Sequence, residues 1–284
     1  MRTVVHLSDL HFGRVDPRIV PSLVHVISAI APNLVAVSGD LTQRARRSQF
    51  IQARAFLQQL SFPQIVVPGN HDVPLFNVAA RLVSPLAGYR RYIARDLEPV
   101  FQDEEIIVVA LNSARRAILP GGAGKLNEGQ VGRAAARLKS AGPRVVRIVV
   151  THHPFELPEG HGEKHLIGRS QMAMAQLAAV GADLFLAGHL HVSHVGHTAE
   201  RYQIAGHSAL VVQAGTMSTR GRGEPNSFNV VRLARPDITV ERLTWDEGRQ
   251  TFLPSWSEQF QHGPEGWAAL PPKVKLPAIP QLSS

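Results

Sequence analysis

Short apolar runs alternate with helical patterns over the first two thirds of the chain. The runs at residues 3–8, 34–38, 65–67, 105–111, 145–150 and 183–187 are apolar at most positions and rich in β-branched residues. Apolar residues recur at helical spacing over residues 17–31, 47–60, 127–140 and 169–180. Strands that are apolar on nearly every residue are buried on both faces. The alternation therefore predicts βαβ units and a largely parallel sheet covered by helices.

After His191 the pattern changes to segments that read as closely spaced strands. They cover residues 192–199, 201–205, 209–214, 227–233 and 238–245, and short polar turns join them. This spacing predicts a run of mostly antiparallel strands. Prolines are frequent from residue 254 onward, and apolar periodicity is weak there. We therefore expect one domain over residues 1–253 and a proline-rich C-terminal extension over residues 254–284, packed on the surface or partly disordered.

The composition limits the chemistry that this domain can carry. The chain has 284 residues with no cysteine and 14 histidines, and 30 Lys+Arg against 22 Asp+Glu give a formal net charge of +8. The lack of cysteine excludes disulfides, thiolate-ligated zinc, iron–sulfur clusters and a cysteine nucleophile. A bound metal must then take nitrogen and oxygen ligands. No apolar run approaches the roughly 18 residues of a membrane span, and no secretory signal is evident, so we expect a cytoplasmic protein.

The positive net charge indicates which kinds of molecule the protein could bind. A basic balance fits an anionic substrate or nucleic acid. Aromatic residues make up only 6% of the chain, which is a poor basis for stacking single-stranded bases. The charge therefore favours a small phosphate ester over nucleic acid.

Acidic, amide and histidine side chains directly follow the predicted strands. In chain order the clusters are Ser8-Asp9-Leu10-His11, Ser38-Gly39-Asp40, Gly69-Asn70-His71-Asp72, Thr151-His152-His153-Pro154 and Gly188-His189-Leu190-His191. In open α/β sheets, ligands bind outside the carboxyl ends of the strands. These five loops should therefore deliver a set of seven nitrogen and oxygen ligands, from aspartate, asparagine and histidine side chains, to a single crevice.

This ligand set is too large for one tetrahedral zinc ion. It suits two divalent ions that share one carboxylate, as in centres whose ions lie about 3.5–4 Å apart and stabilise the attacking and leaving oxygens of a displacement. Mixed imidazole and carboxylate ligation favours Mn, Fe, Zn or Co over Ca or Mg. The sequence therefore predicts a dinuclear centre and leaves the identity of the metal open.

Taken together, the clusters resemble the calcineurin-like metallophosphoesterase superfamily. Its pattern is Asp-x-His, Gly-Asp, Gly-Asn-His-Asp/Glu, a later His and Gly-His-x-His, and each block has a counterpart here, in this order, between residues 9 and 191. Size and block spacing are most similar to the bacterial branch of cyclic-nucleotide phosphodiesterases and glycerophosphodiesterases. The resemblance implies an α/β fold, a four-layer αββα sandwich in which helices flank two mixed β-sheets.

The resemblance also implies a role for the residues of these blocks. One ion would be bound by Asp9, His11 and His191, the other by Asn70, His152 and His189, and Asp40 would bridge them. His71 would bind no metal and would face the substrate phosphate, as a transition-state stabiliser or leaving-group acid. Asp72 would orient the His71 ring through a hydrogen bond. The reaction implied is in-line attack on phosphorus by a metal-bound hydroxide.

Four other residues are predicted contacts of the substrate. Asn112 and Arg115 follow the strand that ends at residue 111, and in this family that loop often approaches the substrate. His153 adjoins the predicted metal ligand His152, and it either contacts the substrate or packs against its neighbours in the protein. His161 and His165 have the spacing of a helical metal pair, but the surrounding glycines and proline favour a loop. Such a loop could cap the substrate pocket, with His161 as a contact.

The substrate class that the resemblance implies is a small phosphodiester, such as a cyclic nucleotide or a glycerophosphodiester. A phosphomonoester, a nucleotide-sugar or lipid diphosphate, DNA cleaved by an exonuclease, and a non-catalytic scaffold stay open as alternatives. A diphosphatase at a membrane surface would show an apolar cap. Residues 76–100 fit that cap or a helix on the core, because apolar residues recur there at helical spacing, at Leu82, Val83, Leu86, Tyr89, Tyr92 and Ile93. Homodimerisation through the late strands or the proline-rich extension also stays open.

Overall fold

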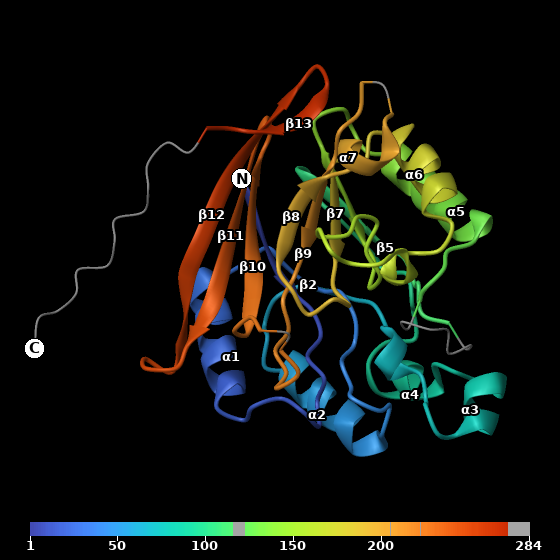
Figure 1. Ribbon diagram of the computed structural model, residues 1–284, viewed down its shortest axis with the longest axis vertical. Helices are drawn as coiled ribbons and strands as arrows, with labels where there is room; N and C mark the ends of the chain where they lie inside the picture. Colours follow the sequence, from blue (N-terminus) through green and yellow to red (C-terminus); the bar gives the residue numbers. More distant parts are fainter. Residues whose placement is uncertain (116–122, 205, 222, 272–284) are drawn as a thin grey trace, which may run out of the picture.

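The computed structural model describes residues 1–115, 123–204, 206–221 and 223–271, which fold into strands and helices (Figure 1). The strands are β1 (Arg2–Leu7), β2 (Leu34–Val37), β3 (Gln64–Val66), β4 (Val100–Gln102), β5 (Ile106–Ala110), β6 (Val146–Val150), β7 (Leu184–Ala187), β8 (His194–His197), β9 (Leu210–Gln213), β10 (Ser227–Ala234), β11 (Asp237–Asp246), β12 (Thr251–Gly263) and β13 (Gly266–Ala269). The helices are α1 (Ile19–Ile30), α2 (Arg47–Leu57), α3 (Val78–Val83), α4 (Ala87–Tyr92), α5 (Glu128–Lys139), α6 (Ser170–Ala178) and α7 (Ala199–Tyr202), and short 3-10 turns lie at η1 (Asn70–Asp72) and η3 (Glu163–His165).

The strands form two sheets, and both are mixed. The larger sheet has the order β13-β12-β11-β10-β1-β2-β3, and the smaller one has the order β4-β5-β6-β7-β9-β8. In the larger sheet β1 is parallel to β2 and antiparallel to β10. In the smaller sheet β9 is parallel to β7 and antiparallel to β8. The parallel strands β1, β2 and β3 of the larger sheet therefore end on one side of that sheet, as the parallel strands β5, β6, β7 and β9 do in the smaller one.

Three apolar clusters fill the spaces between the layers. Successive residues of β1 point to opposite faces, so that Val5 packs with α1 and α2 while Val4 packs against the smaller sheet. On the outer face of the smaller sheet, Val131 of α5 and Leu177 of α6 cover Ile107. Figure 1 shows α5 and α6 on one side of the two sheets and α1 on the other. The predicted four-layer αββα sandwich is confirmed.

One of the predicted late strands is wrong. The segment expected as a strand over residues 201–205 begins within α7, which covers Ala199–Tyr202; residue 205 lies outside the described residues. Alanine, glutamate and arginine, which open α7, are good helix formers. Its one aromatic side chain, Tyr202, is buried and donates a hydrogen bond to the carbonyl of Phe155. Tertiary packing of one residue therefore fixes a short helix where apolar spacing suggested a strand.

The larger sheet continues past residue 253, where the sequence suggested that the domain ends. β12 runs to Gly263 and β13 to Ala269, so the expected boundary falls inside a strand. Pro254 is tolerated because a register irregularity lies opposite it in β11 and because β13 pairs only with the end of β12. The apolar pattern is weak because few side chains of β12 turn inward, among them Phe260. Residues 272–284 of the predicted extension lie outside the described residues.

Residues 76–100 form two short helices in different surroundings. α4 packs inward, and the hydroxyl of its buried Tyr89 donates to the carbonyl of Val66 at 2.8 Å. α3 leaves Leu82 and Val83 54% and 84% exposed. The apolar spacing of this segment therefore belongs partly to the core and partly to an exposed apolar surface. In the part of the chain that the structure describes, every helix is too short or too polar to cross a membrane.

The buried histidine of β1 should make stability depend on pH. His6 is fully buried with its Nε2 2.9 Å from Ser38 Oγ, and burial lowers its pKa from 6.5 to about 3. Below pH 6.5 the unfolded chain takes up a proton at His6 that the folded chain does not. The neutral ring therefore contributes its full stability above pH 6.5, and this contribution falls by about 1.4 kcal/mol per pH unit toward pH 3.

Urea unfolding of chelator-treated protein between about pH 7.5 and pH 5 checks this expectation. The free energy of unfolding should fall less steeply in His6→Gln, in which the amide can keep the contact with Ser38 but does not titrate. Equal slopes in the variant and the wild type would contradict the assignment to His6.

Candidate metal centre

The predicted metal ligands come together where strands of both sheets end. They follow β1 (Asp9 and His11), β2 (Asp40), β3 (Asn70, in η1), β6 (His152) and β7 (His189 and His191). Backbone hydrogen bonds join the loops: the amide of Asp9 donates to the carbonyl of Gly39, and the amide of Gly188 donates to that of His152. The side chains are buried except that of Asn70, which is half-buried. One edge of the sandwich thus holds the whole predicted set.

Five of these residues have a left-handed backbone. The values of φ are +52° at Asp9, +45° at His11, +52° at Asp40, +75° at His189 and +61° at His191. They make up five of the nine non-glycine residues with positive φ in the described part of the chain. This conformation costs an L-residue about 1–2 kcal/mol and persists where the surroundings enforce it, often at functional sites. The loops are therefore held in strained conformations by the contacts around the centre.

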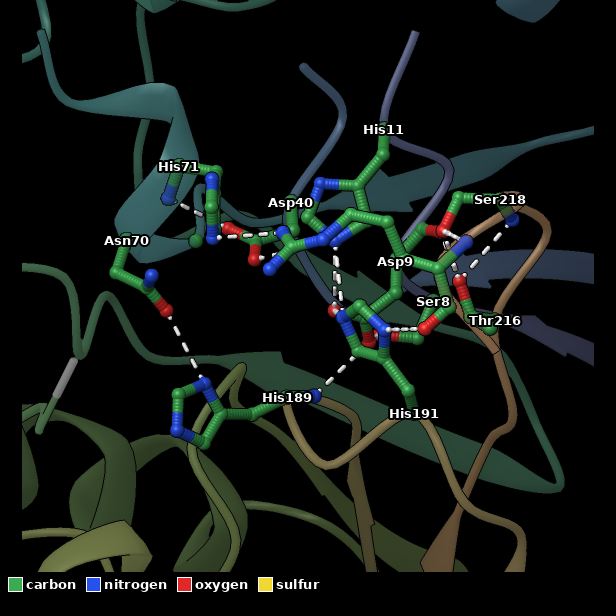
Figure 2. A network of polar contacts seen from close by, with 12 residues as sticks. Ser8, Asp9, His11, Asp40, Asn70, His71, His189, His191, Thr216 and Ser218 are labelled. Atoms are coloured by element: carbon green, nitrogen blue, oxygen red, sulfur yellow. Dashed lines mark hydrogen bonds and ion pairs between the residues drawn. The ribbon is translucent and has the colours of Figure 1, made fainter. Parts of the chain in front are cut away.

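Asp9, His11 and His191 form one half-site. Oδ1 of Asp9 lies 3.1 Å from Nε2 of His191 and 3.5 Å from Nε2 of His11, and the two Nε2 atoms are 3.0 Å apart (Figure 2). Oδ2 of Asp9 accepts hydrogen bonds from the hydroxyl of Ser8 and the amide of His189. Oδ1 is buried without a hydrogen-bond donor among the described residues. One carboxylate oxygen is thus fixed by donors, and the other faces two imidazole nitrogens.

Asn70, His152 and His189 form the second half-site, with Asp40 between the two. Oδ1 of Asn70 lies 3.1 Å from Nε2 of His152 and 3.1 Å from Nδ1 of His189, the contact drawn in Figure 2. Oδ2 of Asp40 lies 3.4 Å from Nε2 of His152 and 3.7 Å from Nε2 of His11. Asp40 therefore adjoins a histidine of each half-site, which is the place expected for a bridging carboxylate.

The outer hydrogen bonds of the histidines favour cations at this centre. Nδ1 of His152 lies 2.8 Å from the carbonyl of Ser38, and Nδ1 of His191 lies 3.1 Å from the carbonyl of Arg220. A carbonyl can only accept, so each Nδ1 carries a proton, and Nε2 is the nitrogen left to bind a metal ion. The two Nε2 atoms face the oxygens of Asn70 and Asp9. Nitrogen and oxygen atoms that converge in this way fit divalent metal ions, and the carbonyls supply the usual outer contacts of metal-binding histidines.

The charges of the centre agree with this ligand set. Burial opposes ionisation of Asp40, but His152 lowers the pKa of this carboxyl. Burial lowers the pKa of His152 while Asp40 raises it, to about 9 in all. Burial and the neighbouring His152 lower the pKa of His189 to about 3. The centre thus keeps Asp40 ionised and His189 neutral, the forms that would bind metal, and a cation would take the place of the proton on His152.

His71 lies beside the half-sites, with Arg220 against it. Nδ1 of His71 donates to the carbonyl of Gln43 at 2.9 Å, and Nε2 lies 3.2 Å from a guanidinium nitrogen of Arg220. Burial lowers the pKa of His71, so the neutral ring accepts a hydrogen bond from Arg220. The sequence analysis did not identify Arg220 as a site residue. It lies in the loop before β10, outside every cluster, and no local signal connects it with residues 149 positions away.

The prediction that Asp72 orients the ring of His71 is wrong. Its carboxylate instead accepts hydrogen bonds from the amides of Gly69 and Thr42 and from the hydroxyl of Thr42. Burial and the nearby Asp40 raise its pKa to about 6. Asp72 thus ties the loop after β2 to the turn η1, and it is too deeply buried to meet a substrate. Its role is to hold the turn that carries His71.

Two histidines from the loop after β6 lie against His189. The ring of His153 is fully buried, with its centroid 4.6 Å from that of His189, so of its two predicted roles burial favours packing. Nδ1 of His165 lies 3.3 Å from Nε2 of His189. The ring of His161 faces a carbonyl of its own loop. The turn η3 therefore brings His165, and not the predicted His161, next to the centre.

Asn112 and Arg115 line a separate cavity of about 360 Å³ beside α4. The side chain of Asn112 accepts a hydrogen bond from the amide of Ala114. Burial and the nearby Arg169 lower the pKa of Arg115. The described residues that line this cavity include none of the predicted metal ligands. Contact of Asn112 and Arg115 with a substrate therefore stays a prediction.

Comparison with known sequences agrees with the chemistry of the centre. A family model described as calcineurin-like phosphoesterase matches residues 2–193, which contain all of the clusters. A probable cyclic nucleotide phosphodiesterase of Synechococcus sp. is 28% identical over 123 residues, which cover 39% of this chain and 44% of that protein. The match thus spans less than half the length of this relative.

Solved structures of low sequence identity share the fold. A dimetal phosphatase from Danio rerio has a TM-score of 0.61 and 14% identity, over 89% of this chain and 98% of that one. The purple acid phosphatase PPD1 from yellow lupin seeds has a TM-score of 0.64 and 10% identity, over 90% of this chain and 53% of that one. At these identities the comparison shows a common fold, and the chemistry of this chain rests on its own residues.

Proposed function

The chain belongs to the calcineurin-like phosphoesterase family, and we propose that it is a hydrolase of a small phosphodiester that uses two divalent metal ions. A cyclic nucleotide or a glycerophosphodiester is the proposed substrate class, and Mn, Fe, Zn or Co are the proposed ions. The observation that carries the proposal is the convergence of imidazole nitrogens with carboxylate and amide oxygens in two adjacent half-sites. The weak similarity to a probable cyclic nucleotide phosphodiesterase supports a diester.

The proposal assigns each half-site one ion. Asp9, His11 and His191 would bind the first ion, Asn70, His152 and His189 the second, and Asp40 both. Two ions in these positions would lower the pKa of bound water to near neutrality and offset the charge of the phosphoryl oxygens. The ring orientations that this requires are already fixed by the carbonyls of Ser38 and Arg220.

Arg220 and His71 would act on the phosphate from the edge of the centre. The guanidinium group of Arg220 would donate a charge-assisted hydrogen bond to a phosphoryl oxygen. Nε2 of His71 is in contact with that guanidinium and accepts from it in the free protein. A bound phosphate would draw the guanidinium away and raise the pKa of His71. The ring could then hold a proton at Nε2 and deliver it to the leaving oxygen.

A substrate panel tests the proposal. The protein is stripped with a chelator, reloaded with Mn, Fe, Co or Zn, and assayed with a bis-aryl phosphate, an aryl monophosphate, cyclic AMP, 2′,3′-cyclic nucleotides, a glycerophosphodiester, a lipid-linked nucleotide sugar and linear DNA. We expect metal-dependent hydrolysis of the diesters. Inactivity toward every ester after reloading would refute a hydrolase, and activity confined to the monoester or to DNA would refute the small diester.

A lipid-linked diphosphate is the second candidate substrate. α3 and the residue before its cap expose apolar side chains, with Phe76 77% and Val83 84% exposed. They follow directly on the turn η1 that carries His71. Faster hydrolysis of the lipid-linked nucleotide sugar than of cyclic AMP in the same panel would favour this candidate.

Replacing Asn70 by aspartate should tighten metal binding and slow turnover. Oδ1 of Asn70 faces nitrogens of His152 and His189 at 3.1 Å, and a neutral amide leaves more charge on an ion than a carboxylate does. We expect metal retention to rise and kcat to fall, each by about tenfold. Atomic spectroscopy after dialysis against a chelator measures the first, and steady-state kinetics the second.

Asn127→Asp is the matched control for this exchange. Asn127 caps α5 by accepting from the amide of Gln130, and aspartate caps helices equally well. Its metal content and turnover should equal those of the wild type. Unchanged turnover in Asn70→Asp would contradict the assignment of Asn70 as a ligand.

A further inference from the structure

A cavity lined by arginines lies between α2, α4 and the edge strand β3. Its volume is about 610 Å³, within the range of about 300–1,000 Å³ that small-molecule sites occupy. Arg54 comes from α2, Arg90 and Arg91 from α4, and Arg95 from the segment after α4. Among the described residues that line it, the only acidic one is Asp96. The lining thus carries a formal charge of +3 and includes none of the predicted metal ligands.

These arginines form no ion pairs within the described part of the chain. Other arginines are paired with carboxylates, as Arg2 is with Asp103 at 2.7 Å and Arg133 with Glu98 at 2.9 Å. None of the four cavity arginines forms an ion pair with a described residue, and Asp96 instead accepts from the amide of Glu98. The exposed side chains of these arginines give the cavity a positive potential. This potential favours an anionic ligand.

The inner wall of the cavity is apolar and fixed. Leu57 and Val66 are buried and line it. The hydroxyl of Tyr89 donates to the carbonyl of Val66 at 2.8 Å and so holds α4 on β3. Gly88 of α4 lies so close to α2 that a Cβ atom there would be 2.6 Å from the ring of Phe50. The cavity is therefore present before any ligand binds.

We propose that this cavity is a binding site for a small organic polyphosphate, of the class of the nucleoside diphosphates. Guanidinium groups bind phosphates through paired, charge-assisted hydrogen bonds. An apolar wall below them would take the organic part of the ligand. Tyr92 also lines the cavity, with the guanidinium carbon of Arg91 5.6 Å from its ring centroid. A ligand here would leave the metal centre open.

Calorimetric titration of the full-length chain with α,β-methylene-ADP, which is not cleaved between its phosphates, tests the site. We expect one binding event that persists when the metals are removed by a chelator. Arg54→Ala/Arg91→Ala should weaken it about a hundredfold, or about tenfold for each lost guanidinium, and leave hydrolysis of the diester unchanged. Arg144→Ala, an exposed arginine outside the cavity lining, is the control and should bind as the wild type does.

Titrations with other ligands show which class of molecule the cavity binds. Tripolyphosphate should bind more weakly than α,β-methylene-ADP, because it has no organic part for the apolar wall. Equal or tighter binding of tripolyphosphate would overturn the assignment to an organic polyphosphate. Loss of all binding on chelation, or equal affinity in the double variant, would overturn the site itself. Tighter binding of a short DNA duplex that is lost in the double variant would replace the small molecule with nucleic acid.

Discussion

Asp40→Asn should lower the turnover of the metal-loaded enzyme by about a thousandfold and reduce its content of bound metal below two ions per chain. Oδ2 of Asp40 is 3.4 Å from Nε2 of His152 and 3.7 Å from Nε2 of His11, so its negative charge serves both half-sites. An asparagine keeps the shape of the side chain and removes that charge. Two cations held close together would then repel each other without the anion between them.

The exchange at Asp40 separates metal binding from folding. Oδ1 of Asp40 accepts a hydrogen bond from the amide of His71 at 2.8 Å, and an amide oxygen can accept the same bond. The turn that carries His71 should therefore keep its place. Asp16→Asn, which removes a carboxylate paired with Arg18 at the surface, is the control. Full occupancy by two ions together with wild-type turnover in Asp40→Asn would refute the bridging role.

Atomic spectroscopy of the dialysed proteins and steady-state kinetics of the reloaded ones measure these effects. Loss of one ion only would indicate which half-site depends more on the bridge. Asp40 is buried, so salt in the solvent screens its charge only weakly. The effect of Asp40→Asn should therefore be insensitive to salt, in contrast to the loss of an exposed ion pair.

The fold and the gathering of the predicted ligands at one edge could be predicted because they depend on local features of the sequence. Strands buried on both faces, such as β2 and β6, are apolar at every or nearly every residue, and this is visible without a structure. Polar residues directly after such strands have few places to go except the edge where the strands end. Asp9, Asp40 and His152 could therefore be brought together from position in the chain alone.

The residues that the sequence did not reveal depend on contacts between distant segments. Arg220 reaches His71 from a loop that no strand-end cluster marks. The role of Asp72 depends on which donors its turn faces, and these belong to the loop after β2. His161 and His165 differ only in how the loop after β6 folds back. Local pattern predicts which residue types gather at an edge, whereas the partner of each side chain follows from tertiary packing.

Gly188→Ala should destabilise the fold by about 3 kcal/mol and disturb the first half-site. A Cβ atom at Gly188 would lie 1.7 Å from the hydroxyl oxygen of Ser8 and 2.5 Å from Oδ2 of Asp9. These two atoms share a hydrogen bond of 2.7 Å, and Oδ2 also accepts from the amide of His189. The added methyl group would have to displace them, and the carboxylate would then turn away from His191.

Gly132→Ala is the matched control, because nothing lies within 4 Å of a Cβ atom at Gly132 and the residue lies within α5. Alanine there should stabilise the protein by about 1 kcal/mol through its better helix propensity. Urea unfolding and metal analysis of both variants provide the comparison. If Gly188→Ala matched the wild type in both, the tight packing of β7 against the loop after β1 would not be needed. Steric crowding would then not explain why a glycine opens the Gly-His-x-His block, and the fixed position of Asp9 would need another cause.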